Sequence, residues 1–231
     1  MRAILVSVDY GNMLRRTLPY NRHHFDEVMV VTVPEDALSI RMAQSSNAKV
    51  FLTNAFYDDG ALFNKWKALE QALDKFGRHG LMCIMDADIL WPQKIPYQEY
   101  ALGKLYTPVR HLMACNGSCP LPRDETQWKR YPVSREEDFA GYTQIFHAED
   151  PHLPEPPWHE QDWKHAGGAD TMFQNLWPDE DKIRTKWQVL HMGPTGTNWA
   201  GRDEQSRAKL KSLLCKRGSH SEDRFYEEKI R

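Results

Sequence analysis

The chain has 231 residues, of which 41% are hydrophobic and 27% charged, and its formal net charge is −2. Its length and composition predict one globular domain with a sizeable core, and the near-zero net charge excludes a general attraction to nucleic acid. The longest apolar runs are too short to span a membrane and no signal-peptide pattern is present, so we expect a soluble, cytoplasmic protein. The four cysteines show no disulfide framework, which fits that compartment.

Strand and helix patterns alternate in the first half of the chain. This alternation favours βαβ units in a mainly parallel α/β sheet flanked by helices. Polar residues follow the first two strands, with Asp9 and Tyr10 after the first and Asp36 after the second. The strand ends therefore gather polar groups. Strands are predicted at residues 3–8, 28–33 and 49–53, and the first helix at 13–24.

The clearest helix is predicted at 60–76, with Gly77 as its stop. Its apolar residues recur by three and four and form one stripe. Lys65 lies near the start of this helix. It either points back to the strand ends or is an ordinary surface lysine.

A buried strand is predicted at 80–85, and it stops at Asp86-Ala87-Asp88. Two carboxylates one residue apart at the carboxyl end of a parallel strand are suited to hold a divalent cation, which in turn would bind a diphosphate. The alternative is that one aspartate caps the next segment while the other faces solvent, since Asp-X-Asp triplets also recur by chance. Both interpretations stay open at this point.

Residues 93–138 are rich in proline and largely irregular, with a strand predicted at 103–109. Long irregular segments in compact domains often shape binding sites. His111, Cys115 and Cys119 are spaced by four residues. We do not favour a zinc site there, because a fourth ligand is missing and the spacing is not that of a finger or a ribbon.

A further strand is predicted at 141–146, and a proline-rich loop follows it. The loop contains Trp158, Asp162 and Trp163 and leads into a Gly-Gly turn that ends in Asp170. Tryptophan rings stack on sugars or bases, and an acid at the start of a helix can act as a general base. Alternatively, Asp170 caps a helix at 171–177 and the tryptophans fill the core.

The last predicted strand, 187–190, runs into His191 and a Gly-rich turn that contains Trp199 and Arg202. A histidine at a strand end is placed as a metal ligand or is structural, and Arg202 can neutralise phosphate. A helix is predicted at 203–214. Residues 215–231 are so charged that we expect a loosely held tail.

The order of these motifs resembles that of the GT-A glycosyltransferases. Strand and helix alternation comes first, then Asp86-Ala87-Asp88, then Gly167-Gly168-Ala169-Asp170 and finally His191-Met192-Gly193. The resemblance covers residues 1–202 and implies a GT-A, Rossmann-like single domain. We expect it at 1–214, with a nucleotide-binding half at 1–92 and an acceptor-binding half at 93–214.

The resemblance also implies an activity and a set of site residues. It implies transfer of a hexose or pentose from a nucleoside diphosphate sugar, most simply a UDP-sugar, with Mn²⁺ or Mg²⁺ on the diphosphate. Asp88 is implied as the direct metal ligand, Asp86 as a contact to ribose or metal, and His191 as the residue that completes the metal shell. At the ends of the first two strands it implies nucleoside contacts by Val8, Asp9, Tyr10 and either Glu35 or Asp36. Lys65, Ala87 and Arg202 are added to the donor site on their positions in the sequence.

On the acceptor side, the resemblance implies Asp170 as the base of an inverting reaction, with Asp162 as the second choice. Trp158, Trp163 and Trp199 would line the donor or acceptor pockets. The second strand departs from the family because Pro34-Glu35-Asp36 replaces the familiar Asp-Asp-Gly-Ser turn. This departure puts base recognition by Asp36 in doubt.

The acceptor stays open between a glycan and DNA. The compact chain is similar to small glycosyltransferases of bacteriophages, some of which modify hydroxymethylated pyrimidines in DNA in the host cytoplasm. A patch of Lys209, Lys211, Lys216 and Arg217 would serve a DNA acceptor, or these residues are simply solvated.

Three other function classes use part of the same chemistry. A nucleotidyltransferase would carry a Gly-rich basic loop after the first strand, where this chain has Asp9-Tyr10-Gly11-Asn12. A haloacid-dehalogenase-like phosphatase has its Asp-X-Asp after the first strand. A non-catalytic sugar- or nucleotide-binding module would need the tryptophans but not the acids and the histidine together.

Overall fold

The structure is a computed structural model that describes residues 1–113, 120–122, 124–133, 139, 141–193 and 202. The predicted helix at 203–214 and the tail at 215–231 lie outside the described residues, as do Cys115, Cys119 and Trp199. Within the described part, the sheet has eight strands in the order β3-β2-β1-β4-β7-β6-β8-β5. No helix of this part is both long and apolar enough to cross a bilayer.

The sheet is mixed. Strands β1 to β4 pair in parallel, β7 runs antiparallel to β4 and β6, β8 runs parallel to β6, and β5 is antiparallel to β8. The strands are β1 Arg2–Val6, β2 Glu27–Thr32, β3 Lys49–Leu52, β4 Leu81–Asp86, β5 Ile89–Leu90, β6 Leu105–Met113, β7 Thr143–His147 and β8 Lys182–Met192. The α-helices are α1 Gly11–Asn21, α2 Ala37–Ser45, α3 Lys65–Phe76 and α4 Ala169–Gln174. The short 3₁₀ helices are η1 Arg22–His24, η2 Ala55–Gly60, η3 Glu125–Arg130 and η4 Asp179–Asp181.

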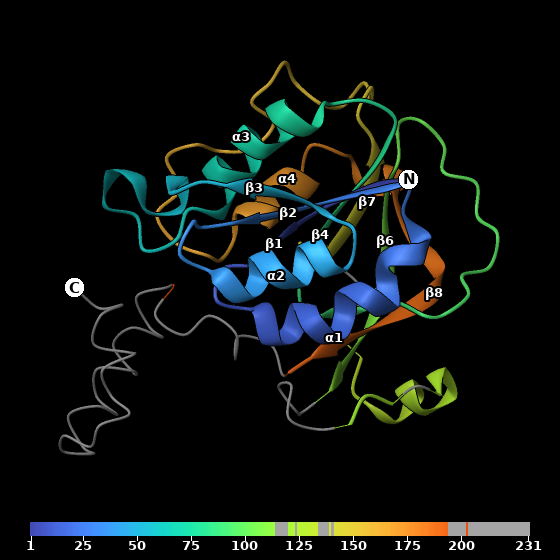
Figure 1. Ribbon diagram of the computed structural model, residues 1–231. Helices are drawn as coiled ribbons and strands as arrows, with labels where there is room; N and C mark the ends of the chain where they lie inside the picture. The colour runs from blue at the N-terminus through green and yellow to red at the C-terminus, as the bar shows by residue number, and fades with distance from the viewer. Residues whose placement is uncertain (114–119, 123, 134–138, 140, 194–201, 203–231) are drawn as a thin grey trace, which may run out of the picture.

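Helices cover both faces of the sheet, with α3 and α4 on one side and α1 and α2 on the other (Figure 1). Successive residues of a strand point to opposite faces, so Ile4 joins a cluster with Trp66 and Phe173, while Leu5 joins a cluster with Leu14. Because both faces are buried, the first strands are continuously apolar rather than alternating. The predicted mixed, mainly parallel sheet flanked by helices is confirmed.

The predicted strands at 3–8, 28–33, 49–53, 80–85 and 141–146 are confirmed with small shifts at their ends. The helix predicted at 60–76 begins later, at Lys65, because Asn64 caps it by accepting a hydrogen bond from the Lys67 N–H. The strand predicted at 187–190 is the last part of the longer β8. Strand β5 is not among the predicted strands, and it forms because its two residues pair with His191 and Leu190.

Candidate active site

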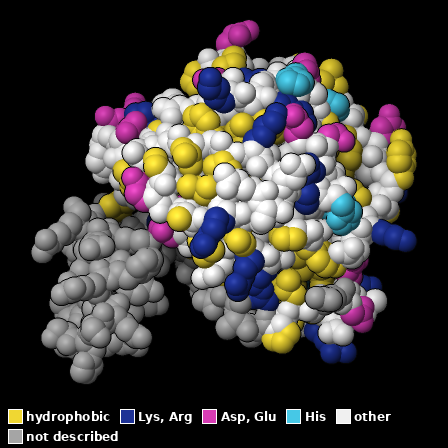
Figure 2. Space-filling view, in the orientation of Figure 1, with side chains coloured by type: hydrophobic (Ala, Val, Ile, Leu, Met, Phe, Trp, Pro, Cys, Tyr) yellow, Lys and Arg dark blue, Asp and Glu magenta, His cyan; other side chains and the backbone are white. Residues whose placement is uncertain are grey.

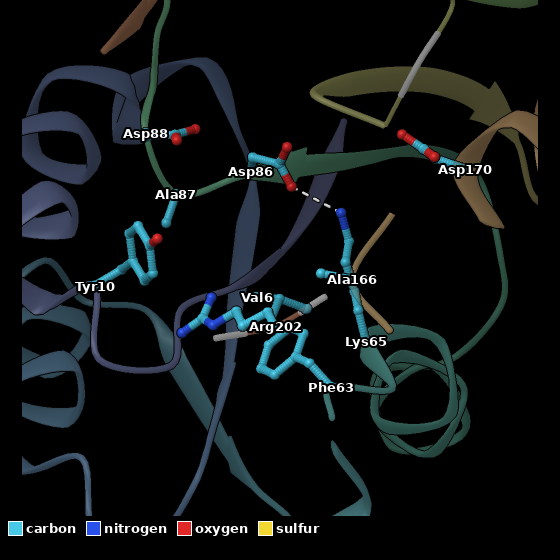
Figure 3. A pocket seen from close by; sticks show the side chains of 10 residues that line it. All are labelled: Val6, Tyr10, Phe63, Lys65, Asp86, Ala87, Asp88, Ala166, Asp170 and Arg202. Atoms are coloured by element: carbon cyan, nitrogen blue, oxygen red, sulfur yellow. Dashed lines mark hydrogen bonds and ion pairs between the residues drawn. The ribbon is translucent and has the colours of Figure 1, made fainter. Parts of the chain in front are cut away.

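A cavity of about 90 Å³ opens at the carboxyl ends of β1 and β4 (Figure 3). The parallel register of these strands places Val6 opposite Asp86, so the turns that follow both strands meet here. Side chains from α3, from α4 and from Arg202 complete the walls. The cavity is lined by Val6, Tyr10, Phe63, Lys65, Asp86, Ala87, Asp88, Ala166, Asp170 and Arg202.

Lys65 points back to the strand ends, as one of the two interpretations of its position required. Its Nζ lies 2.7 Å from Asp86 Oδ1, and its side chain is buried. Burial by itself lowers the pKa of Lys65, but the attraction of Asp86 and Asp170 outweighs burial and the pKa lies above its usual value. The cavity therefore holds a fixed positive charge between two carboxylates, as Figure 3 shows.

Asp88 and His191 meet although β4 and β8 are not neighbours in the sheet. Strand β5 pairs Ile89 with His191, and the Met192 N–H donates to the Asp88 carbonyl at 2.9 Å. His191 Nε2 consequently lies 3.5 Å from Asp88 Oδ2, and both side chains are buried. His191 Nδ1 donates to the Gly193 carbonyl at 2.6 Å, so a neutral His191 turns the lone pair of Nε2 toward the carboxylate.

This arrangement fits a divalent cation in part. In the neutral form of His191, its Nε2 and Oδ2 of Asp88 both present lone pairs to each other. Two such acceptors repel each other unless a positively charged atom, such as a metal ion, lies between them. Among the described residues, no three acidic, histidine or cysteine side chains form a preassembled metal site. Mg²⁺ commonly binds one or two carboxylates together with substrate phosphates and water. The donor set therefore suits an ion whose shell a diphosphate completes.

Asp170 lies across the cavity from Asp86. Its Oδ2 accepts a hydrogen bond from the Gly141 N–H at 2.7 Å, and its Oδ1 accepts one from the Thr171 N–H at 3.1 Å. Gly168, with a φ of 92°, is the N-cap of α4, so the alternative interpretation of Asp170 as the cap is wrong. Gly141 allows this contact, because a Cβ there would lie 2.7 Å from Asp170 Cβ.

Arg202 lies against two aromatic rings of the cavity wall. Its guanidinium carbon is 4.6 Å from the Tyr10 ring centre and 4.2 Å from that of Phe63, and Nη2 donates to the Val8 carbonyl. Its carbonyl accepts a hydrogen bond from the Ala166 N–H at 2.9 Å. Burial raises the pKa of Tyr10 to about 12 even though Arg202 acts to lower it, so Tyr10 is neutral at physiological pH.

Asp36 has a structural role in the fold, and its expected contact with the nucleoside stays a prediction. Its carboxylate caps α2 through the Ser39 N–H and also accepts hydrogen bonds from Thr32 Oγ1 and from the Asp9 N–H at 2.6 Å. Asp9 is exposed and holds a left-handed φ of 58°. Neither residue is part of the cavity lining, and Val8 contributes only its carbonyl to Arg202.

Trp158 and Trp163 both make contacts within the fold. Trp158 is buried against Phe146 and under the Arg78 guanidinium and is not among the residues that line the cavity, so its expected place in an acceptor pocket stays a prediction. Trp163 donates its indole N–H to the Gly167 carbonyl at 2.8 Å and so supports the Gly-Gly turn. Asp162, the second choice for a base, is exposed and outside the cavity lining.

His111 is also structural. Its two ring nitrogens contact the Tyr131 carbonyl at 3.1 Å and Gln188 Oε1 at 2.8 Å. Phe63, Ala166 and Gly141 belong to the site, but the sequence did not single them out. Gly141, the first residue of a predicted strand, is the one signal that the sequence offers, since glycine at a strand end often marks a close approach of another chain segment.

The comparisons with known proteins concern the fold. No protein-family model and no curated protein matches the sequence. A mannosyltransferase from Pyrobaculum calidifontis, in complex with GDP-Man and Mn²⁺, matches 94% of this chain with a TM-score of 0.50 and 15% identity. The match covers 64% of that protein, so this chain spans less than two thirds of its length.

A mycobacterial protein matches 95% of this chain and 76% of its own length, with a TM-score of 0.53 and 15% identity. The fold is GT-A-like. Glucosyl-3-phosphoglycerate synthase from Mycobacterium tuberculosis, in complex with Mn²⁺, UDP and its product, has a TM-score of 0.49 at 15% identity. That match covers 95% of this chain and 81% of the synthase.

Proposed function

We propose that this protein is a metal-dependent glycosyltransferase, which moves a sugar from a nucleoside diphosphate sugar to an acceptor hydroxyl. One observation carries the proposal: Asp86 and Asp88 lie on one side of a cavity and Asp170 on the other, with Lys65 between Asp86 and Asp170 (Figure 3). Acids on both sides of a donor site are what group transfer from a diphosphate to a hydroxyl requires.

On the donor side, Asp88, His191 and Asp86 would hold Mn²⁺ or Mg²⁺. When bound, such an ion stabilises the negative charge on the departing diphosphate. Lys65 and Arg202 add positive charge beside the same position, and both are already fixed by neighbours, so they need little reorganisation. Tyr10 and Phe63 exclude water from that side of the cavity.

On the acceptor side, Asp170 would act as the general base. The bond between the sugar's anomeric carbon and the diphosphate oxygen breaks, the acceptor oxygen bonds to that carbon, and the acceptor proton passes to Asp170. The Gly141 N–H holds Asp170 Oδ2, which orients the carboxylate toward the cavity. A base opposite the leaving group corresponds to inversion of configuration.

We further propose that both halves of the domain build the site. Residues 1–92 supply Asp86 and Asp88, and the acceptor half, 93–214, supplies Asp170 and Arg202. The mannosyltransferase with the similar fold binds GDP-Man, so GDP-sugars stand beside UDP-sugars as donors. The acceptor stays open between a glycan hydroxyl and a hydroxymethylated pyrimidine of DNA, and the basic residues considered for DNA lie outside the described residues.

The test is a thermal melt with UDP, GDP, CDP or ADP, each with and without Mn²⁺. A ligand that binds only the native state raises the melting temperature. We expect one nucleotide to stabilise the protein only with the metal, and Asp88→Ala to abolish this effect. Asp179→Ala is the matched control, since it removes an exposed acid that is not part of the cavity lining. A melt that no nucleotide changes would reject the donor site.

Nucleotide binding and transfer are then separated by a transfer assay. Hydrolysis or transfer of the sugar from the stabilising nucleotide sugar, lost in Asp170→Asn while the melt still responds, supports the transferase. Binding without any release of nucleoside diphosphate would instead favour the non-catalytic module.

A further inference from the structure

Helix α1 carries two polar side chains on its buried side. Along its outer side, lysine or arginine side chains lie beside hydrophobic ones on the molecular surface (Figure 2). On the inner side, Thr17 and Asn21 are fully buried. They are four residues apart, so they lie one above the other on the same face of the helix. Buried polar side chains need hydrogen-bond partners, and this pair finds them in the segment that follows β4.

Thr17 holds the residue directly before Asp88. Its Oγ1 lies 2.6 Å from the Ala87 carbonyl oxygen and 3.2 Å from the Met13 carbonyl oxygen of its own helix. A hydroxyl has one proton to donate, and only the distance to Ala87 lies within the usual range for a hydroxyl donor. Thr17 therefore donates to the middle residue of the Asp86-Ala87-Asp88 triplet.

Asn21 holds the residues that follow Asp88. Its Nδ2 donates to the Ile89 carbonyl at 2.8 Å, and its Oδ1 accepts from the Trp91 N–H at 2.9 Å. Strand β5 is the last strand of the sheet, and this side-chain amide bonds to its backbone as a neighbouring strand would. On the β8 side, the Asp88 carbonyl accepts from the Met192 N–H at 2.9 Å. The backbone around Asp88 is therefore held between α1 and β8.

Helix α1 is a firm support for this contact. Its residues Leu14 and Leu18 are buried in one cluster with Ile89. The start of α1 packs closely on α2, since a Cβ on Gly11 would lie 2.4 Å from Leu38 Cγ, an approach that only glycine permits. On the other side, only two residues of β5 pair with β8. The position of the segment therefore depends mainly on the helix.

We propose that Thr17 and Asn21 are positioning residues of the candidate metal site. They fix the backbone on either side of Asp88, so its carboxylate faces His191 Nε2 before a cation binds. Neither residue lines the cavity, so both act through the backbone and not by contact with a ligand. A carboxylate that is already in place loses less conformational freedom on binding. This inference rests on the proposed function, because it takes Asp88 as a ligand of Mn²⁺ or Mg²⁺.

The test is Mn²⁺ binding to the full chain, measured by electron paramagnetic resonance of the free ion, with Mn²⁺ alone and with added UDP or GDP. Thr17→Val keeps the shape of the side chain but removes the hydroxyl, and it should weaken Mn²⁺ binding at least about tenfold. Asn21→Leu removes two hydrogen bonds and should weaken it at least as much. Thr17→Ser keeps the hydroxyl and should stay within about twofold of the wild type. Equal losses in the serine and valine variants would assign the effect to packing and overturn the proposal.

Thr185→Val is the matched control for lost stability. Thr185 is buried in β8, its Oγ1 donates to the Trp187 carbonyl at 3.0 Å, and it lies about 20 Å along the strand from His191. Both valine variants should lower the melting temperature by about 2–4 °C, since each loses one buried hydrogen bond. Only Thr17→Val should weaken Mn²⁺ binding.

The same titrations separate this inference from the proposed function. Wild-type protein that binds Mn²⁺ with an affinity that Thr17→Val and Asn21→Leu leave unchanged would overturn the positioning role alone. Wild-type protein that binds no Mn²⁺, with or without UDP or GDP, would reject the metal-dependent function and the positioning role with it.

Discussion

Lys65 Nζ lies 2.7 Å from Asp86 Oδ1, and this ion pair connects the first residue of α3 to the last residue of β4. The pair places a positive charge in the candidate donor site before any ligand binds. A bound diphosphate would then meet an ammonium group that is already oriented, which reduces the cost of binding.

Replacing Lys65 with methionine should therefore weaken binding of the stabilising nucleoside diphosphate and Mn²⁺ by about tenfold, since a charge-assisted contact is lost. Calorimetry measures this affinity. Lys67→Met is the matched control, because Lys67 pairs with Asp58 and Asp59 away from the cavity. Equal affinities for the two variants would show that Lys65 only supports the fold.

Asp170→Asn keeps an oxygen for the Gly141 N–H but removes the base. We expect a loss of about 10²–10⁴ in kcat with nearly unchanged nucleotide binding. Gly141→Ala should also lower kcat, because its Cβ would lie 3.0 Å from Asp170 Oδ2 and displace the carboxylate. A transfer assay beside a nucleotide-dependent melt separates the two steps. Full activity of Asp170→Asn would exclude this residue as the base.

Asp36→Ala should lower the free energy of unfolding by about 1–2 kcal/mol, because it removes the cap of α2 and two further hydrogen bonds. Urea unfolding measures the change. If Asp36 is structural, the relative affinities for UDP, GDP, CDP and ADP stay the same in this variant. A change in base preference would instead return Asp36 to nucleoside recognition.

The stability of the protein should fall as the pH drops below about 6.5, and His159 is one cause. Burial lowers the pKa of His159 although Glu70, 2.5 Å from Nδ1, acts to raise it. A depressed histidine pKa means that the unfolded chain binds the proton first, so this contribution is present above pH 6.5 and is lost as the pH falls.

Glu70 extends the same trend to lower pH. Burial acts to raise its pKa, but His159 and Arg78 outweigh burial, so the pKa lies below its usual value. Its stabilising contribution is present above about pH 4.5, the value in the unfolded chain, and is lost as the pH falls through the folded pKa.

His159→Phe keeps the stacking between Trp66 and Phe173 but cannot be protonated. We expect it to be less stable than the wild type at pH 7.5, by about 1–3 kcal/mol for the lost hydrogen bond to Glu70, and to lose less stability on going to pH 5.5. Urea unfolding at both values checks this. A wild-type pH dependence in His159→Phe would assign the effect to other groups.

The sequence predicts best what local patterns determine. Continuous apolar runs mark β1, β2 and β4, and the Asp86-Ala87-Asp88 triplet lies at a strand end because the run before it stops there. From the sequence alone, Lys65 could be predicted to lie near the site, but not that its side chain points into it. Its direction depends on where Asn64 caps α3, and the cap shortens the predicted helix.

What the sequence misses depends on contacts between distant segments. The contact of Gly141 with Asp170 joins the turn before β7 to the first turn of α4, and the pairing of β5 with β8 involves only two residues of each strand. No periodicity marks such features. Trp158 shows a further limit of the sequence: an aromatic residue in a proline-rich loop can equally bind a sugar or pack in the core, and its burial could not be read from the sequence.

The two-residue strand β5 also has a dynamic consequence. Asp88 and His191 belong to distant parts of the chain, and their meeting depends on the β5 pairing and on the Met192 N–H bond to Asp88. Opening so short a ladder costs far less than unfolding the sheet. Deuterium should therefore replace the Met192 amide proton faster than the amide protons of β1. Asp88 and His191 can then separate and meet again while the rest of the molecule stays folded.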